Sequence, residues 1–379
     1  RFVTADCVRC GECRRVCPVV RPNEYEGSLT YRKAIYAPLR DAVPQTYVVD
    51  IEYCLNEPPN YLPCRRCVGA CETKCIKFDM PLEQTVTREV RSVVVATGYG
   101  LVDPLTLPEY GYGTHPDVMT AFELEHMLAP RGPAGGYVVR PSNEETPERV
   151  LFVLGIGSRK RHGMLHSSGF SWNYTAKHVS ALLKQDITDI SVLYQDQRAY
   201  GVGFFDFWNQ TVGADAKLIR SHVERVRPGG DGQIDVRYEV TDEAQILTES
   251  YDLVILVPEV IPPAGLPELA DVLGIELAAD GFVRVEETHG TLVATTRPGV
   301  YVVGCASGPK DIPDRAGEGR AAAVAVLDKA SRRRTSPMRA ETAASVVPPP
   351  PRGVPAKAAP AVDYGEQRVA PPELQTLFA

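Results

Sequence analysis

The chain has 379 residues, a formal net charge of −7 and a hydrophobic fraction of 44%. This length allows roughly two or three domains, and the acidic balance excludes the broad basic field that holds nucleic acid or an acidic lipid surface. The longest apolar runs, such as Ser92–Ala96 and Leu253–Val257, have the length of strands, whereas a membrane helix needs about 20 residues. We therefore expect no nucleic-acid partner and no membrane span.

The cysteines are concentrated at one end of the chain. Nine of the ten lie between Cys7 and Cys75, and only Cys305 lies outside. Dense Cys-x-x-Cys clusters in a large acidic chain indicate metal ligands in a reducing compartment, because a disulfide framework usually spans a whole small domain. We therefore expect a cytoplasmic protein, although the chain begins at Arg1 rather than Met and its N-terminus supports no targeting argument.

The first cysteine motif is Cys7-x2-Cys10-x2-Cys13-x3-Cys17-Pro18. This is the spacing of bacterial-type ferredoxins, in which three thiolates hold one four-iron cluster and the fourth, before proline, binds the neighbouring cluster. Zinc is the alternative for four thiolates, but zinc knuckles typically use two well-separated Cys-x-x-Cys pairs. The motif therefore predicts iron–sulfur ligation.

The second motif repeats part of the first, because Cys64-x2-Cys67-x3-Cys71 has the spacing of the last three cysteines of the run. Cys54 then takes the place of the leading cysteine, with an enlarged loop between it and Cys64. Two [4Fe–4S] clusters follow, and with crossed ligands one set is Cys7, Cys10, Cys13 and Cys71, and the other is Cys54, Cys64, Cys67 and Cys17. Cys75 is spare in this assignment; an alternative uses Cys75 and frees Cys54. Glu72 stands where a ferredoxin has proline, which weakens the crossover at Cys71.

The rest of the chain separates by composition. We expect a cysteine module over 1–88, a β-rich segment over 89–148, a Rossmann-like domain over 149–260, a closing strand–turn–helix region over 261–330 and a Pro/Ala-rich tail over 331–379. Alternating strands and helices in the third region predict a βαβ unit with a parallel sheet. The expected elements are strands at Ser92–Gly98, Val150–Leu154, Ile190–Tyr194, Leu253–Val257 and Val300–Val303, and helices at Trp172–Lys184 and Gly317–Ala330. The tail is expected to be disordered or to order on a partner.

Two further motifs, about 200 residues apart, indicate a flavin. Ala96-Thr97-Gly98 ends a strand, and Gly299–Pro309 (GVYVVGCASGP) precedes another turn and a helix. In flavoproteins with two dinucleotide domains, the first motif marks the return to the FAD domain, and the second places a strand end and a helix N-terminus against the flavin. We expect a catalytic electrostatic role for Lys310, whose alternative is an ordinary surface lysine. The expected cofactor-binding residues are Thr97, Gly98, Tyr99, Gly304, Cys305, Lys310, Asp311, Ile312, Ala316 and Gly317.

A nicotinamide site has weaker support. The turn Gly155-Ile-Gly157 follows a strand, as a dinucleotide fingerprint should, but Lys160 occupies the position of the third glycine. Asp196 is the one acidic residue close after the second strand. We expect this turn to be a tight βα connection.

Three stretches together resemble the A subunit of heterodisulfide reductase and its relatives. They are the Cys7 motif with Pro22-Asn23-Glu24 and Arg32–Tyr36, the unusual motif from Cys54 to Phe78, and Gly304–Asp314 (GCASGPKDIPD) with its alanine-rich helix. The resemblance covers roughly residues 1–330. It implies a thioredoxin-reductase-like FAD domain with an inserted ferredoxin module, in which the flavin passes electrons between clusters and partner subunits. Residues 89–148 would then be the return segment of the FAD domain and residues 261–330 its C-terminal part. The implied fold class is α/β: a partial two-dinucleotide-domain flavoprotein with an α+β 2[4Fe–4S] module.

This sequence departs from that family in two places. The opening βαβ unit with the G-x-G-x-x-G that holds the FAD pyrophosphate is absent, so the chain is either a fragment or shares its FAD with a second polypeptide that supplies this lobe. The stretch Lys160–Tyr174 has no cysteine where many relatives are cysteine-rich. An additional cluster near the flavin is therefore not expected, and whether the chain takes part in the electron bifurcation that some members of the family perform stays open.

The resemblance and the motifs together predict an electron-transfer subunit of a multi-subunit oxidoreductase, with two [4Fe–4S] clusters and FAD. Its partners would be other iron–sulfur or flavin subunits, and substrate chemistry would reside on them. One alternative is an NAD(P)H-dependent flavoprotein reductase similar to the small subunit of glutamate synthase. Another is a non-enzymatic interaction protein in which the clusters serve only as structural staples.

Overall fold

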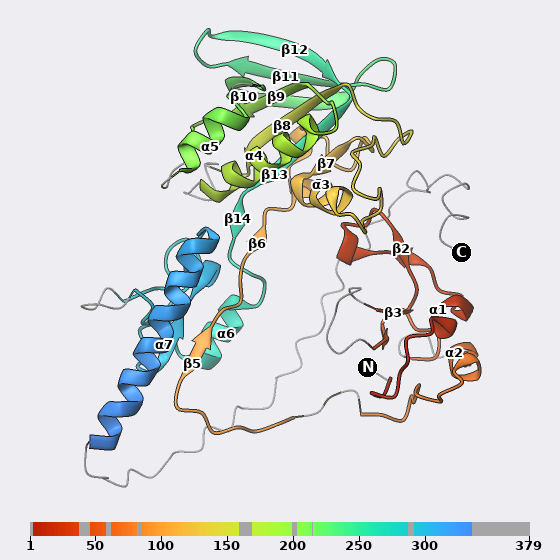
Figure 1. Cartoon of the computed structure of the whole chain (residues 1–379), viewed down its shortest axis with the longest axis vertical. Helices are drawn as coiled ribbons and strands as arrows, with labels where there is room; N and C mark the ends of the chain where they lie inside the picture. Colours follow the sequence, from red (N-terminus) through yellow and green to blue (C-terminus); the bar gives the residue numbers. More distant parts are fainter. Residues whose placement is uncertain are drawn as a thin grey trace. The chain divides into compact units, whose positions relative to one another are not determined.

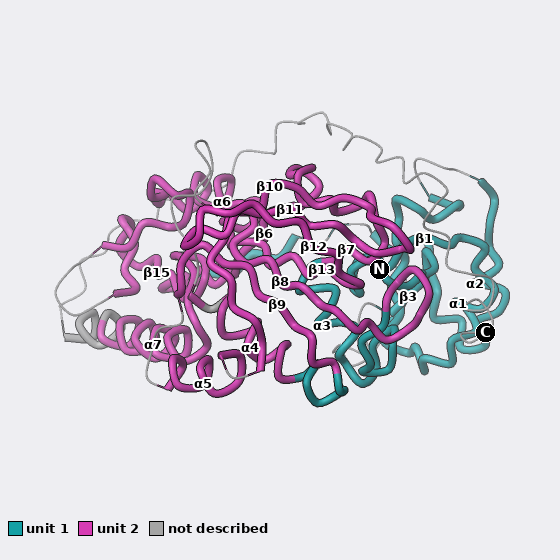
Figure 2. Tube along the Cα trace, turned by 90° about the horizontal axis from the view of Figure 1, so that it is seen from above, with its two compact units in different colours: residues 1–89, 120–139, 181–186 teal, residues 90–119, 140–180, 187–379 magenta. Residues whose placement is uncertain are grey.

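The computed structural model describes residues 3–37, 46–57, 62–81, 83, 85–158, 169–198, 203–213, 215–286 and 292–335. The chain divides into two compact units, shown in different colours in Figure 2. Unit 1 comprises residues 1–89, 120–139 and 181–186, and unit 2 comprises 90–119, 140–180 and 187–379. Most of the predicted tail, and most of the cysteine-free stretch at Lys160–Tyr174, lie outside the described residues. The predicted domain boundaries stay predictions.

Unit 1 is built from short elements around the cysteines. They are α1 (Glu12–Val16), β1 (Arg21–Pro22), β2 (Tyr31–Arg32), β3 (Ile35–Tyr36), β4 (Val48–Val49), α2 (Arg66–Ala70) and α3 (Ala121–Leu128) (Figure 1). Strand β1 pairs with β2, and β3 pairs with β4, both antiparallel. The buried core of the cysteine-rich part consists of Val3, Cys13, Ile35, Val49, Cys75 and Ile76. So few apolar side chains give a small core, which leaves room for a cofactor to contribute to stability.

Unit 2 contains a seven-stranded sheet with the order β12-β11-β10-β9-β8-β13-β7. The strands and nearby helices are β7 (Val118–Thr120), β8 (Arg149–Ile156), α4 (Gly169–Leu183), β9 (Asp189–Tyr194), α5 (Phe204–Thr211), β10 (Lys217–Pro228), β11 (Ile234–Val240), β12 (Gln245–Tyr251) and β13 (Leu253–Pro258). Strands β8, β9 and β13 are parallel neighbours. The predicted βαβ unit is therefore confirmed, and with it the α/β class.

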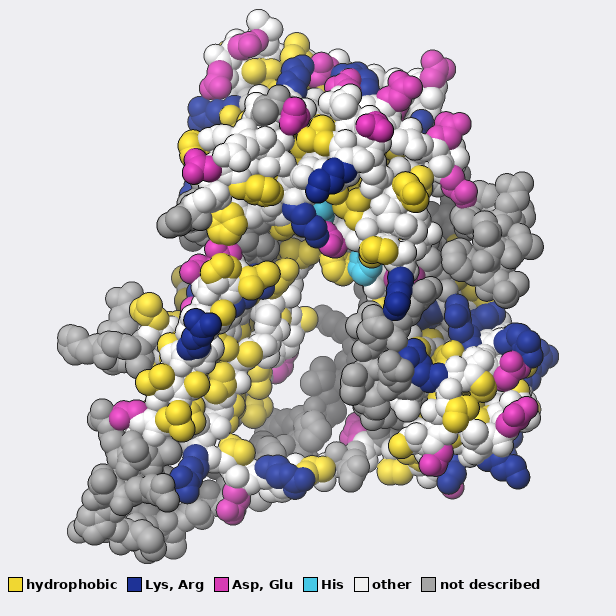
Figure 3. Space-filling model, viewed as in Figure 1, with side chains coloured by type: hydrophobic (Ala, Val, Ile, Leu, Met, Phe, Trp, Pro, Cys, Tyr) yellow, Lys and Arg dark blue, Asp and Glu magenta, His cyan; other side chains and the backbone are white. Residues whose placement is uncertain are grey.

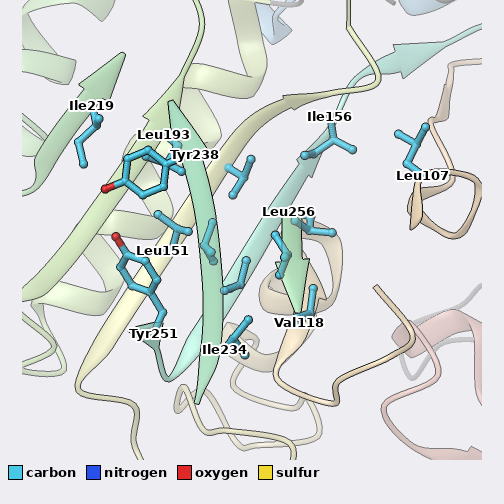
Figure 4. Packing of buried hydrophobic residues seen from close by; sticks show 14 residues of the cluster. Leu107, Val118, Leu151, Ile156, Leu193, Ile219, Ile234, Tyr238, Tyr251 and Leu256 are labelled. Atoms are coloured by element: carbon cyan, nitrogen blue, oxygen red, sulfur yellow. The ribbon is translucent and has the colours of Figure 1, made fainter. Parts of the chain in front are cut away.

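The sheet is mixed, so the predicted parallel arrangement describes only part of it. Strand β10 runs parallel to β9 but antiparallel to β11, and β11 is antiparallel to β12. All six residues of β13 are buried, as expected of a strand covered on both faces. Figure 4 shows the core side chains, including Leu151, Leu256 and Tyr238, packed together over the strands.

The remainder of unit 2 forms a smaller α/β body. Its elements are β5 (Val93–Val95), β6 (Gly100–Leu101), β14 (Val260–Ile261), α6 (Leu266–Leu273), β15 (Val300–Val302) and α7 (Ile312–Thr335). Strands β5 and β15 pair in parallel, and β6 pairs with β14 antiparallel. A second core, which includes Val95, Leu266, Ala270 and Val302, lies beneath this pair.

The segment 89–148 is less β-rich than expected, because it also contains α3. This helix begins with a capping box: the Thr120 hydroxyl accepts from the backbone N–H of Glu123, and the Glu123 carboxylate accepts from the backbone N–H of Thr120. In the part of the chain that the structure describes, no helix combines the length and the apolar character needed to cross a membrane.

Candidate functional site

The two cysteine motifs fold alike. Cys17 and Cys71 each follow a five-residue helix, and each donates its backbone N–H to the carbonyl three residues earlier, of Arg14 and Val68, over 3.3 Å. The two helices, α1 and α2, contact each other (Figure 1). Gly11 precedes α1 with φ of 84°, a left-handed conformation that suits glycine. The duplication of cysteine spacing is therefore also a duplication of local structure.

One group of thiols lines a pocket that is otherwise mostly apolar. Its cysteines are Cys17, Cys54, Cys64 and Cys67, and Ala34, Ile35, Val49 and Leu55 complete much of the wall. Burial, together with the charges of Cys54, Cys17 and Cys64, raises the pKa of the Cys67 thiol to about 11. Cys17 belongs to the first motif and its three companions to the second, as the crossed ligand set requires.

The remaining cysteines of unit 1 form a second group, which begins with Cys7. Burial raises the pKa of the Cys13 thiol to about 12, and the nearby charges of Cys7, Cys67 and Cys10 act in the same direction. Burial also raises the pKa of Cys75 to about 11, with contributions from Cys71 and Cys7. The second group therefore comprises the cysteines that do not line the pocket, Cys7, Cys10, Cys13, Cys71 and Cys75, and within it the Sγ atoms of Cys71 and Cys75 lie 3.4 Å apart.

The donor chemistry of both groups fits iron–sulfur clusters. All ten cysteines of the chain are free thiols, and thiolates are the ligands of such clusters. Within the described ranges, no three His, Cys, Asp or Glu side chains converge closely enough to hold a single metal ion. A four-iron cluster is a cage, so its ligands surround a volume rather than a point. The assignment of individual ligands stays a prediction.

The two flavin motifs meet at one edge of unit 2. Val93 pairs with Val300 and Val95 with Val302, and the N–H of Val303 donates to the Val95 carbonyl over 2.9 Å. Because β5 and β15 are parallel, the segments that follow them emerge at the same carboxyl edge, where α/β sheets bind ligands. Thr97 and Gly98 follow β5, and Gly304 follows β15. Gly98 has φ of 75° with open space where a side chain would lie, so it offers room for a ligand.

The side chain of Lys310 has polar partners within this chain. Its Nζ lies 2.9 Å from Glu318 Oε1, 2.6 Å from Ser307 Oγ and 3.4 Å from the Gly304 carbonyl. The other oxygen of Glu318 accepts from the backbone N–H of Gly304 at 2.7 Å. Sequence reasoning missed Glu318, and the only available signal was an acidic residue at the second position of the predicted helix Gly317–Ala330. The role of Lys310 toward a flavin stays a prediction.

The helix after this turn begins earlier than predicted. Helix α7 starts at Ile312, because the Asp311 carboxylate accepts from the N–H of Asp314 at 2.9 Å and so caps the first turn. Pro313 is tolerated there, since its missing N–H has no partner in a first turn. Ala316 and Gly317 therefore lie one turn inside the helix and not at its start, which corrects the expected position of the helix N-terminus.

Two other predicted residues of this edge are also placed. The Cys305 side chain is 3% exposed, and its Sγ lies 3.6 Å from the Lys310 carbonyl, so it points into the turn. Tyr99 is 40% exposed, and the Arg315 guanidinium carbon lies 5.8 Å from its ring centre. Arg315 also donates to the Lys310 carbonyl at 2.8 Å. Arg315 joins the two motifs across the edge and was not predicted.

The space beside the Gly155-Ile-Gly157 turn is filled by another segment of the chain, at Val102. A side chain at Gly157, whose φ is 86°, would lie 2.8 Å from Cγ1 of Val102. The N–H of Val102 donates to the carbonyl of Glu259, which directly follows β13. The glycine thus permits close approach of residue 102. Strand β8 ends at Ile156 and α4 begins at Gly169, so the connection is longer than the tight βα turn that was expected, and most of it lies outside the described residues.

The chain is similar to known proteins over most of its length, although no protein-family profile matches it. It is 36% identical over 330 residues to the A subunit of the H2:CoB–CoM heterodisulfide,ferredoxin reductase of Methanothermobacter thermautotrophicus, covering 86% of this chain and 49% of that protein. It is 35% identical over 326 residues to the iron-sulfur A subunit of the CoB–CoM heterodisulfide reductase of Methanocaldococcus jannaschii, covering 84% and 48%. The thioredoxin reductase of T. acidophilum is similar at 14% identity with a TM-score of 0.42, over 63% of this chain and 66% of that one.

The fold and the grouped thiols define an α/β protein with a cysteine-rich module. The similarity narrows this class: over these residues the chain belongs to the family of the A subunit of heterodisulfide reductase. The chain spans about half the length of the curated relatives it matches.

Proposed function

We propose that this chain is an electron-transfer subunit of a larger oxidoreductase, which binds two [4Fe–4S] clusters and contributes half of an FAD site. The observation that carries the proposal is the pocket in which Cys17 of the first motif joins Cys54, Cys64 and Cys67 of the second. Crossed ligands of this kind couple two neighbouring clusters within one module, which suits the relay of single electrons. Free thiols in such number suit a reducing compartment, so we place the protein in the cytoplasm.

The FAD half-site consists of the residues at the shared carboxyl edge of β5 and β15. Thr97, Gly98 and Tyr99 would contact the cofactor from one strand end, and Gly304 from the other. The start of α7, at Asp311 and Ile312, would direct the positive end of the helix dipole toward its negative charge. FAD, when bound, supplies both hydride and single-electron chemistry. Lys310 would act on the flavin only as part of its pair with Glu318.

A second polypeptide lobe is proposed to complete this site. The β5–β15 pair is the whole of its sheet among the described residues, yet parallel sheets are normally larger and covered on both faces. Several apolar side chains nearby are exposed: Val94 by 45%, Ile312 by 76%, Val324 by 66% and Leu327 by 68%. Figure 3 shows hydrophobic side chains over the surface of α7. A βαβ lobe with the missing pyrophosphate loop would cover them, whether it belongs to the same polypeptide or to a partner.

The remaining partners are inferred from the relatives. These proteins are named as subunits of reductases for the CoB–CoM heterodisulfide. We propose that this chain likewise works with other iron–sulfur or flavin subunits, on which substrate chemistry resides.

The crossed ligand set is tested with one variant from each motif. Cys17→Ala and Cys64→Ala should both reduce the iron content from about eight to about four atoms per chain, because both remove a ligand of the same cluster. The electron paramagnetic resonance (EPR) spectra of the two reduced variants should match each other and differ from that of Cys10→Ala. Iron, acid-labile sulfide and flavin are measured per polypeptide. Zinc in place of iron, or no acid-labile sulfide in the parent chain, would refute the proposed function.

A further inference from the structure

The cysteine-rich module has one thiol more than the two proposed clusters need. Eight ligand positions are available for nine cysteines up to Cys75. Cys54 lines the pocket with Cys17, Cys64 and Cys67, so it is not the spare thiol. The surplus therefore belongs to the group around Cys7, where Cys71 and Cys75 compete for one position.

The surplus thiol lies in contact with the predicted ligand. The Sγ atoms of Cys71 and Cys75 are 3.4 Å apart. A tight turn brings them together: the N–H of Lys74 donates to the Cys71 carbonyl at 3.1 Å, and Lys74 has φ of 48°. The two thiols are thus held at the spacing of a hydrogen bond and on one side of the turn.

The position of Cys75 is fixed by the body of the module. Its carbonyl accepts from the N–H of Thr4 at 2.9 Å, within the bridge between Val3 and Ile76. Its side chain is only 3% exposed and packs in the same core as Cys13. Cys71 is less buried than Cys75. The pair therefore has one inner and one outer sulfur atom.

We propose that Cys71 and Cys75 are interchangeable ligands at the fourth position of the cluster held by Cys7, Cys10 and Cys13. This inference rests on the proposed function. Exchange replaces one iron–sulfur bond by another, and the proton of the incoming thiol passes to the outgoing thiolate. No electron is gained or lost, and no further reactant is needed.

The local sequence supports exchange. Glu72, rather than proline, follows Cys71, so the φ angle after this ligand is not locked. An unbound Cys71 also has a polar partner at hand, because the hydroxyl of Thr73 lies 3.5 Å from its sulfur. With Cys75 as a substitute, damage to the more exposed Cys71 would leave the cluster bound.

Cysteine-to-alanine variants of the full chain test this inference. Cys71→Ala and Cys75→Ala should each keep about eight iron atoms and eight sulfides per chain, whereas the double variant should keep about four. EPR should show reduced [4Fe–4S] clusters, with no [3Fe–4S] signal, in both single variants. Cys13→Ala is the matched control, because it removes a ligand of the same cluster that has no thiol held in reserve, and it should fall to about four irons.

The outcomes separate this inference from the proposed function. A parent chain without iron contradicts the proposed function itself. A parent chain with about eight irons, together with either single variant at about four, contradicts only the exchange of ligands. A double variant that keeps eight irons also contradicts it, since neither thiol would then be a ligand. If the double variant loses all its iron, the iron contents of the two single variants still decide whether the ligands exchange: about eight irons in both supports exchange, and about four in either contradicts it.

Discussion

At the scale of single residues, Glu318 organises the proposed flavin edge. Its carboxylate binds the ammonium of Lys310 and the backbone N–H of Gly304, and its side chain is 14% exposed. An ion pair shielded from solvent to this degree depends on both partners, because removal of one leaves the other charge poorly solvated. Glu318 therefore connects helix α7 to the end of β15.

Replacing this carboxylate should weaken the edge measurably. We expect Glu318→Gln to lower the free energy of unfolding by about 1–2 kcal/mol, because Lys310 loses its counter-charge and the bond to Gly304 becomes neutral. Urea denaturation measures the change. The control is Glu276→Gln, whose partner Arg284 lies 2.8 Å away but whose side chain is 61% exposed, so we expect less than about 0.5 kcal/mol. Equal effects of the two substitutions would contradict the structural role of Glu318.

At the scale of elements, the turn after β8 shows how a fingerprint can serve packing. Two of its glycines have positive φ, 75° at Gly155 and 86° at Gly157. Val102 contacts the second, and Ser158 donates its N–H back to the Gly155 carbonyl at 3.0 Å. Both glycines are therefore explained without a nicotinamide ligand.

This explanation predicts the behaviour of two variants. Gly157→Ala should cost about 1–3 kcal/mol of unfolding free energy, because a methyl group meets Val102 and φ remains positive. Adding Val102→Ala should restore part of the loss, since it removes the clash but not the backbone strain. Thermal unfolding provides the measurement, with Gly230→Ala as control, where nothing lies within 4 Å. A loss that Val102→Ala leaves unchanged would rule out the packing explanation.

The elements that sequence predicted best are the buried ones. Strands β8, β9, β13 and β15 coincide with short, mostly apolar runs of sequence. Runs of this length are typical of strands that are buried on both faces. The direction of β11 and β12 could not be predicted, because alternation at Ile234, Val236 and Tyr238 indicates a one-sided strand without saying which neighbour it joins.

Part of the candidate site could also be predicted from the sequence, namely its cysteine motifs, whereas the contacts between its side chains could not. Cysteine spacing alone separates the ligands into two motifs, because the chemistry of a cluster fixes that spacing. The contact between Cys71 and Cys75 depends on the left-handed turn at Lys74, and the pairing of Lys310 with Glu318 depends on the turn before α7. Such turns are set by tertiary packing, so sequence spacing does not reveal them.

At the scale of the molecule, the two units differ in the means by which they are stabilised. Unit 2 has a broad aliphatic and aromatic core, whereas two of the six buried residues in the cysteine-rich core of unit 1 are Cys13 and Cys75. Ligation of clusters by the thiols would therefore supply much of the stability of the first unit.

Removal of the clusters should affect the units unequally. After oxidation and chelation, we expect amide hydrogen exchange to accelerate at least about tenfold around Ile35 and Val49. The rates in β8 and β13 should stay as they were, and these strands act as the internal control in the same sample. Mass spectrometry of peptic fragments makes the comparison. Undiminished protection of β3 and β4 would mean that the module folds without its cofactors.

The pairing of β5 with β15 has a consequence for how the chain reaches its native state. Val93 can pair with Val300 only after Val300 has been synthesised, roughly two hundred residues later. Closing so long a loop is entropically costly unless the intervening sheet has already formed and drawn its ends together. The smaller body of unit 2 should therefore assemble last, when the ribosome has released enough chain for both strands, and the flavin edge becomes available only then.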